Sequence, residues 1–487
     1  MTADIRHAER ANQPLLPAAV SLGLFALLLF GAGNSLLRDA DCYWQVALGQ
    51  WIVDHRAVPV SDAFSFTMRG QPWISTQWLA QVFLSESYRW IGWTGPVVLT
   101  SLSVAVAFAL LTQFLQRRLS DKAVLVLLLM AFVNIVPHLQ ARPHALALPF
   151  VVAWIAVLLS AAERKSVPAL PCILLMTVWA NLHGSFLFGL VMVGPIALEA
   201  VVNSEPDARR VVLLRWTIFG IAALAASCLN PYGWNALLAA RNILALGGAL
   251  ELIGEWKPVD FSKLGPISGT VLLIFAAALL SGAKLPPLRA MVVTGLIYMA
   301  VSHVRNADMF GLLAPMVVAA PLAAQFRALA TGDAKLEIRF SQFAAVAALG
   351  VAIAVLATVL KQYTPAPNVT PVAAIDALKA RGATRVLNDY DFGGYMIARG
   401  ISPYIDGRTE LYGEAFTVQH DSATMLKRPE ELFKILDQQR IDATLLHRLS
   451  PAASLLDSLN GWRKIFADSN VVVHMRDESA IQPSDKK

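Results

Sequence analysis

Long apolar runs recur along most of this sequence, and they constrain its fold more than any other feature. Eleven runs can be counted, at 15–36, 95–115, 122–137, 145–162, 167–181, 185–203, 211–229, 265–283, 286–303, 308–326 and 341–361. About 20 predominantly apolar residues cross a bilayer as a helix, so these runs predict transmembrane helices. Some are short or contain proline, and we expect ten to twelve spans. Only 15% of the 487 residues are charged, against about 25% in soluble chains. The sequence therefore predicts a polytopic α-helical membrane protein.

The basic residues are sorted between alternate loops, and this sorting predicts an orientation. The N-terminal segment and five connections carry them: Arg117, Arg118 and Lys122; Arg164 and Lys165; Arg209 and Arg210; Lys284 and Arg289; Arg327, Lys335 and Arg339. The positive-inside rule makes these segments cytoplasmic. The length of run 15–36 favours an uncleaved helix over a signal peptide. The net charge of +6 is thus explained by membrane insertion, and we expect no nucleic-acid partner.

The outward-facing segments carry most of the other polar features. We expect a transmembrane domain over 1–362, whose outer loop 38–94 contains two helices lying at the membrane interface. Beyond it, helix-like runs alternate with short strands, which predicts a small outward α/β domain over 363–478. Residues 479–487 are a polar tail of the kind that is disordered in many proteins.

Two aspartates, Asp39 and Asp41, follow the first apolar run directly and precede a helical pattern that contains Trp44, which is a candidate for substrate binding. On extended backbone, carboxylates two residues apart point to one side. Such a pair suits a general base, or it holds a divalent cation through oxygen ligands. The alternative is that Asp41 only caps the following helix.

Several other polar residues fall at the outer ends of predicted helices. An arginine fork at a helix start suits a phosphate, although a lipid headgroup contact is the alternative. Polar groups at membrane depth are costly unless they are used, although a structural histidine or an interface anchor would have the same pattern. The candidates for binding in a shared outer cavity are Arg142, His144, Asn181, His183, Glu255 and Arg305.

The C-terminal segment contains two further motifs, "LNDYDFGGYMI" and "YIDGRTELYG". Each reads as a strand followed by a polar turn, and loops at strand ends of α/β folds often bind ligands. The candidates here are Tyr390, Asp406 and Arg408. The alternative is that Asp406 and Arg408 pair with each other or with nearby aspartates. The paired glycines at 393–394 match neither the dinucleotide fingerprint nor the phosphate loop.

These motifs together resemble a known class of protein. An acidic pair after the first membrane helix, a long first outer loop, many spans and an outward C-terminal domain resemble the GT-C class of integral-membrane glycosyltransferases. The stretches "DADCYWQVALGQWI", "ARPH", "NLHGSFLFG", "NPYGW", "RNADMF" and "IDGRTELYG" are also similar to those of a group of bacterial multi-pass membrane proteins labelled glycosyltransferases. This second resemblance covers nearly the whole chain.

The resemblance implies transfer of a sugar from a polyprenyl-phosphate donor to a lipid, glycan or protein at the outer face of the bacterial inner membrane. An acidic residue of the first outer loop serves such enzymes as base or metal ligand, and Asp39 or Asp41 matches it. Basic outer residues hold the carrier phosphate. The implied partners are the sugar donor and membrane lipids, with a divalent cation as the one candidate cofactor.

Two other functions fit a chain of this kind. A transporter or flippase of lipid-linked material predicts charges near the bilayer midplane and inverted repeats. In this sequence the ionisable residues gather at the outer edge and no repeat is apparent. A non-catalytic assembly or sensing protein of the envelope is the second alternative, because one fold can serve several functions.

Overall fold

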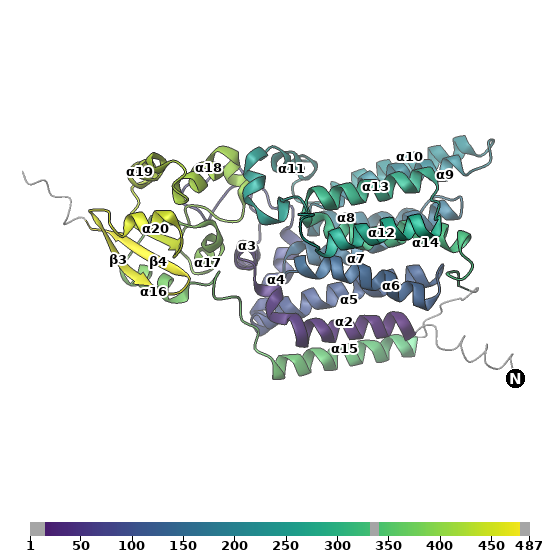
Figure 1. The fold of residues 1–487 in the computed structure, drawn as a ribbon, viewed down its shortest axis with the longest axis horizontal. Coiled ribbons are helices and arrows are strands. Elements are labelled where there is room, and N and C mark those ends of the chain that lie inside the picture. Colours follow the sequence, from purple (N-terminus) through teal and green to yellow (C-terminus); the bar gives the residue numbers. More distant parts are fainter. Residues whose placement is uncertain (1–14, 332–339, 478–487) are drawn as a thin grey trace, which may run out of the picture. The chain divides into compact units, whose positions relative to one another are not determined.

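The computed structural model describes residues 15–331 and 340–477 (Figure 1). Some predicted features lie outside the described residues: the polar tail, the basic N-terminal segment, Lys335 and Arg339. The described chain divides into two compact units. We call 15–33, 97–237 and 253–362 the helical unit, and 34–96, 238–252 and 363–477 the mixed unit.

Every apolar run forms a helix in the structure. The helices are α2 (Leu15–Ala32), α5 (Thr94–Gln116), α6 (Asp121–Ile135), α7 (Pro143–Glu163), α8 (Ile173–Leu182), α9 (Phe186–Val202), α10 (Arg209–Ser227), α12 (Pro266–Ser281), α13 (Pro287–Ser302), α14 (Ala307–Gln325) and α15 (Phe340–Leu360). In the described chain, seven helical segments are long and apolar enough to cross a membrane, and four apolar segments are shorter. The predicted multi-pass membrane fold is confirmed.

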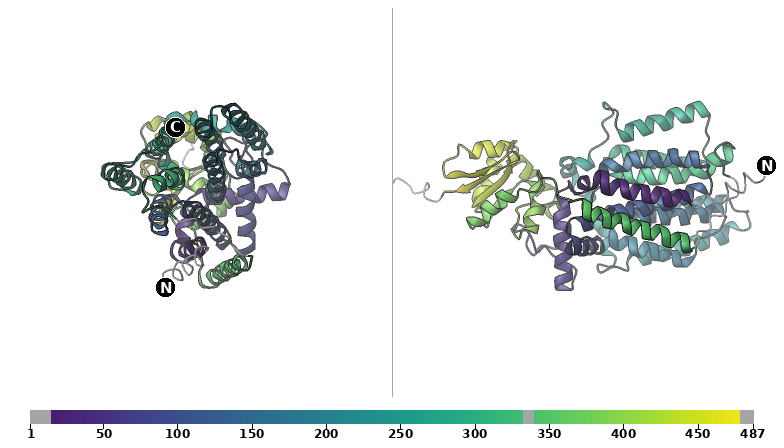
Figure 2. Two further views of the ribbon diagram at one scale, coloured as in Figure 1. Left: turned by 90° about the vertical axis from the view of Figure 1, so that its right-hand side faces the viewer. Right: turned by 90° about the horizontal axis from the view of Figure 1, so that it is seen from below.

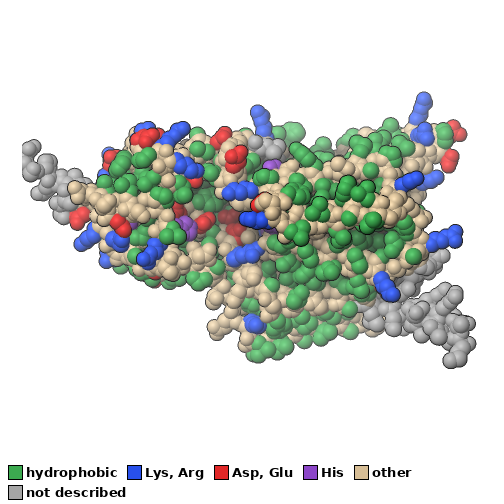
Figure 3. Space-filling model, in the orientation of Figure 1, with side chains coloured by type: hydrophobic (Ala, Val, Ile, Leu, Met, Phe, Trp, Pro, Cys, Tyr) green, Lys and Arg blue, Asp and Glu red, His purple; other side chains and the backbone are tan. Residues whose placement is uncertain are grey.

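Helix α7 is the central element of the helical unit. Two thirds of its most apolar window, 67%, is buried inside the protein, against 6% for α15, which packs on α2. The Trp154 indole donates a hydrogen bond to the Gly189 carbonyl at 2.9 Å, joining α7 to α9. A Cβ at Gly189 would lie 2.4 Å from the Trp179 ring, so glycine permits this close packing. Hydrophobic side chains cover much of the outer surface of these helices, as lipid contact requires (Figure 3).

An ionic network joins the helices near the residues predicted to be cytoplasmic. Arg289 is buried, donates to both carboxylate oxygens of Glu199 at 2.9 Å, and lies 3.4 Å from Glu163. Glu163 also pairs with Arg118 at 2.5 Å. Arg289 therefore does more than serve as a loop charge for insertion, because it links α7, α9 and α13.

The mixed unit is built on a four-stranded sheet in the order β1-β2-β4-β3 (Figures 1 and 2). Its strands are β1 (Val386–Asn388), β2 (Ala443–His447), β3 (Trp462–Ala467) and β4 (Val471–Arg476). Strand β1 runs parallel to β2, and the other pairs are antiparallel. Its helices are α3 (Asp41–His55), α4 (Trp78–Ile91), α16 (Val372–Ala380), α17 (Gly393–Ala398), α18 (Thr409–Thr424), α19 (Pro429–Gln438) and α20 (Pro451–Leu456). The α/β character matches the prediction, whereas β3 and α18 were not predicted. The strand expected in "YIDGRTELYG" is absent from these described residues, because Pro403 forms only an isolated bridge with Val386.

The first long loop groups with this unit, although the sequence assigns it to the membrane domain. Tyr43 of α3 packs edge-on against Tyr395 at 5.1 Å between ring centroids and belongs to the same apolar cluster as Phe392. Successive residues 41–45 of α3 are all buried, so α3 is a core helix of the mixed unit. Helix α4 keeps large exposed apolar side chains, including Phe83 and Trp90, as expected of an interfacial helix.

Candidate functional site

The helical unit brings five of the predicted polar residues together where several helices begin or end. Arg142 directly precedes α7 and His144 lies in its first turn. His183 follows α8, and Arg305 lies in the short turn between α13 and α14. Glu255 belongs to the short helix Gly254–Trp256. We call this group, together with Asp308, the basic cluster.

Two arginines of the basic cluster share one carboxylate. Arg142 Nη1 lies 3.4 Å from one oxygen of Glu255, and Arg305 Nη1 lies 3.3 Å from the other. The guanidinium of Arg305 also stacks over the Trp256 ring, 4.2 Å from its centroid. Burial favours the protonated form of Glu255, but Arg142 and Arg305 outweigh it, so the pKa of Glu255 is lower than usual. Among Arg142, Arg305 and Glu255, two cations and one anion leave one positive charge, and all three side chains remain partly exposed.

Two histidines complete the basic cluster. His144 Nε2 lies 3.8 Å from the Asp308 carboxylate, and the His144 and His183 rings meet edge-on at 6.2 Å. The Nδ1 atom of His183 is 2.8 Å from the Ser185 hydroxyl, which fixes the ring. The sequence-based prediction missed Asp308, although an acid in the first turn of an apolar helix is a costly placement that could have marked it.

The geometry of the basic cluster suits an anion. Arginine forks bind phosphate through paired, charge-assisted hydrogen bonds. A phosphate here would compete with Glu255 for the same N–H groups. Imidazole groups beside it can donate a further hydrogen bond or hold a proton.

Asn181 makes two hydrogen bonds to backbone carbonyl groups. Its side-chain amide donates to the backbone carbonyls of Thr177, at 2.8 Å, and Leu229, at 3.0 Å. It thereby ties α8 to the chain that follows α10. These contacts give Asn181 a structural role.

The acidic pair lies in the mixed unit, and its two members are held differently. One oxygen of Asp39 accepts the backbone N–H of Asp41 at 2.7 Å, so Asp39 makes the cap-like contact at the start of α3. Asp41 is the first residue of α3, and Ala40 occupies the N-cap position. Its carboxylate instead accepts the Trp44 indole N–H at 3.0 Å. The expected alternative of Asp41 as the cap is wrong, because its side chain points along the helix to Trp44.

Gly407 lies directly against Asp41. A Cβ at this position would be 1.8 Å from the Asp41 carboxylate oxygen and 3.0 Å from the Trp44 indole nitrogen. Only a residue without a side chain allows this approach. The backbone at Gly407 therefore restricts where the Asp41 carboxylate can lie.

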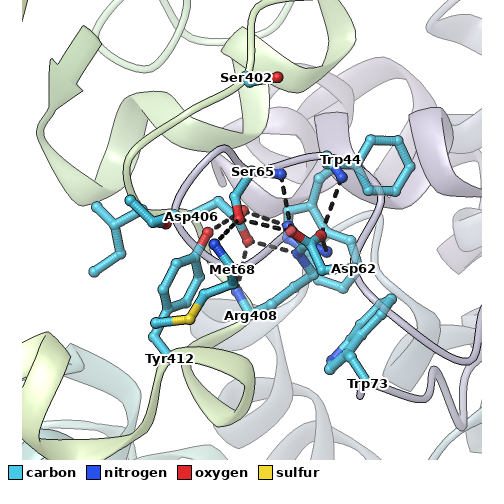
Figure 4. A network of polar contacts seen from close by, with 12 residues as sticks. Trp44, Asp62, Ser65, Met68, Trp73, Ser402, Asp406, Arg408 and Tyr412 are labelled. Atoms are coloured by element: carbon cyan, nitrogen blue, oxygen red, sulfur yellow. Dashed lines mark hydrogen bonds and ion pairs between the residues drawn. The ribbon is translucent and has the colours of Figure 1, made fainter. Parts of the chain in front are cut away.

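The neighbours of Gly407 form a buried ionic network (Figure 4). Arg408 donates to both oxygens of Asp406, at 2.8 and 2.7 Å, and to Asp62 at 2.5 Å. The Tyr412 hydroxyl donates to Asp406 at 2.7 Å. Arg408 is 1% exposed and Asp406 is 0% exposed, so the expected alternative of mutual pairing accounts for both. Asp62, in the "SDAFSF" stretch, was not predicted, because its partner lies far away in the sequence.

Tyr390 is placed by a similar local contact. Its hydroxyl lies 2.8 Å from the Thr409 hydroxyl, at the start of α18. In the described part of the chain, no group of three or more His, Cys, Asp or Glu side chains is arranged to hold a metal ion. The structure thus adds no support to the predicted cation at Asp39 and Asp41.

Comparison with known proteins identifies the fold. No protein-family model and no curated protein matches this sequence. Among solved structures, the chain is similar to the oligosaccharyltransferase of Archaeoglobus fulgidus, with a TM-score of 0.53 and 11% identity, over 97% of this chain and 75% of that one. It is also similar to ArnT from Cupriavidus metallidurans bound to undecaprenyl phosphate, with a TM-score of 0.51 and 11% identity, over 96% and 99% of the two chains. At these identities the similarity establishes a shared fold.

Proposed function

Because this chain has the GT-C fold of integral-membrane glycosyltransferases, we propose that it transfers a sugar from a polyprenyl-phosphate donor to an acceptor hydroxyl. The observation that carries the proposal is the basic cluster, where two arginines and two histidines gather at the ends of apolar helices. An amphipathic donor needs a cationic site beside the membrane for its phosphate. The similar structures include complexes with dolichol-phosphate and undecaprenyl phosphate.

In this proposal Arg142 and Arg305 bind the carrier phosphate. As the bond between the anomeric carbon and the phosphate oxygen breaks, the electron pair stays on the phosphate. Preorganised cations stabilise such developing charge without further reorganisation. His183 and His144 supply further hydrogen bonds to the same group.

We assign the general base to Asp39, with Asp41 as its partner. Asp39 is only partly buried, whereas Asp41 is held by Trp44 and by the backbone at Gly407. Asp39 takes the proton of the acceptor hydroxyl while the hydroxyl oxygen attacks the anomeric carbon. Direct displacement inverts that carbon. The proposed setting is the outer face of the bacterial inner membrane, with the N-terminus cytoplasmic and the C-terminal segment periplasmic.

Two measurements test the proposal. The purified chain in nanodiscs should bind undecaprenyl phosphate by native mass spectrometry. The variant Arg142→Gln/Arg305→Gln should bind it at least tenfold more weakly, since two charge-assisted contacts are lost. In the source cells, Asp39→Asn and Asp41→Asn should change the mass profile of lipids and surface glycans in the same way as gene deletion.

The controls separate binding from catalysis. Glu205→Gln changes an exposed pair with Lys165 and should leave both measurements unchanged. If the aspartate variants insert stably and their profiles match that of wild type, the catalytic assignment fails. If the arginine variant and wild type bind undecaprenyl phosphate with equal affinity, the basic cluster is not the donor site.

A further inference from the structure

The helical unit contains a groove well away along α7 from the basic cluster. It has a volume of about 290 Å³ and lies between α5, α7 and the segment that leads into α8. Leu110 and Phe114 of α5 form one wall, and Ala153, Ala156 and Val157 of α7 form another. This size is close to the lower limit, roughly 300 Å³, of sites that hold small molecules.

One end of the groove is cationic. Arg117 and Arg164 both line it, together with Ser160. Within the described chain neither arginine forms an ion pair, whereas the adjacent Arg118 is paired with Glu163 and Lys165 with Glu205. The groove thus combines apolar walls with two arginines at one end that form no ion pair with any described residue.

The cationic end faces a defined side of the membrane. Arg142 directly precedes α7 and Arg164 directly follows it, and a helix of 21 residues is roughly 31 Å long. The groove's arginines are therefore at the opposite end of α7 from the basic cluster. The loop charges predict that this end is cytoplasmic.

We propose that this groove binds an anionic glycerophospholipid of the leaflet at the Arg117 and Arg164 end. The lipid phosphate lies between the two guanidinium groups, and one acyl chain lies along the small side chains of α7. Basic pockets between transmembrane helices recognise anionic lipid headgroups in this way. The site is distinct from the proposed donor site and does not depend on it.

Lipid binding by the full chain tests the proposal. The chain in detergent is titrated with phosphatidylglycerol or phosphatidylcholine of equal acyl length, and bound lipid is counted by native mass spectrometry. Wild type should retain phosphatidylglycerol preferentially. Replacing either arginine alone with glutamine should weaken phosphatidylglycerol binding about fivefold. The double variant Arg117→Gln/Arg164→Gln should weaken it about thirtyfold. Phosphatidylcholine binding should change little.

A second variant distinguishes a seated lipid from general charge attraction. Ala156→Phe fills the groove and keeps both arginines, so it should also abolish the preference. Arg210→Gln removes an exposed basic residue outside the groove and serves as the matched control. Equal retention of the two lipids by wild type, or a preference unaffected by both groove variants, would overturn the proposal. Loss of the preference in Ala156→Phe alone would assign binding to the groove walls and refute the role of the arginines.

Discussion

Removing Arg408 should severely destabilise the mixed unit. Arg408 forms ion pairs with two carboxylates, Asp406 and Asp62, and all three side chains are buried, at 1%, 0% and 2% exposed. In Arg408→Met the apolar side chain fills a similar volume, but both carboxylates remain buried without their cation. Breaking a buried ion pair by removing one partner costs about 3–5 kcal/mol. We expect a loss of this size.

Hydrogen exchange measures this loss in the full chain. Some amides exchange only when the whole unit unfolds. When this opening is in rapid equilibrium, their exchange becomes faster by the factor that corresponds to the lost free energy of unfolding. About 3–5 kcal/mol corresponds to roughly a hundred- to a few-thousandfold faster exchange. Peptides that contain β1 and β2 should show this acceleration, and peptides from α7 should not.

Two comparisons isolate the cause. Arg399 pairs with Asp376 at 2.6 Å, but their side chains are 33% and 56% exposed, so Arg399→Met should cost at most about 1 kcal/mol. Adding Asp62→Asn and Asp406→Asn to Arg408→Met should restore much of the protection, because no buried charge remains uncompensated. If Arg408→Met exchanges no faster than Arg399→Met, the buried network contributes little and the reasoning is wrong.

Three further predictions concern the proposed sites and the mixed unit. Gly407→Ala should abolish the wild-type glycan profile without loss of membrane insertion, because the new Cβ displaces the Asp41 carboxylate; an unchanged profile would refute this. Glu255→Gln should lower the Kd for undecaprenyl phosphate about tenfold in native mass spectrometry, since it removes the anion that competes for the arginines; weaker binding would mean that Glu255 positions them instead. Burial lowers the pKa of His420 below its usual value of about 6.5. As pH falls, His420 therefore takes up a proton in the unfolded chain before it does so in the folded unit. The free energy of unfolding of the mixed unit, measured by urea titration, should fall below a pH of about 6.5, and His420→Gln should make this pH dependence weaker.

The helical unit was largely predictable because its signals are local. An apolar run and its flanking charges determine a membrane helix within one stretch of sequence. Arg142, His183 and Arg305 were recognisable for the same reason, since polar groups at the ends of such runs stand out. The pairing of Arg142 and Arg305 with one Glu255 carboxylate was not predictable, because a set of candidate residues does not specify which side chains meet.

The mixed unit was less predictable because its contacts join distant segments. Asp62 becomes informative only when Arg408 is placed beside it. The sequence of α3 predicts an amphipathic helix with one exposed face. In the structure the C-terminal segment packs on α3 and buries residues of that face as well. The sequence offered Asp41 as one possible cap of this helix, whereas Asp39 accepts the N–H of Asp41, because either carboxylate is close enough in sequence to reach the free N–H groups.

The mixed unit shows how distant charges can determine the position of one carboxylate. Asp406 and Arg408 are both locked in the buried network, so the backbone of Gly407 between them has little freedom. Gly407 in turn lies against Asp41, which also accepts the indole N–H of Trp44 in its own helix. A side chain at residue 407 would displace the Asp41 carboxylate, and loss of the ionic network would let it move. The "IDGR" motif therefore restricts the position of the Asp41 carboxylate, and ligand binding by Asp406 or Arg408 stays a prediction.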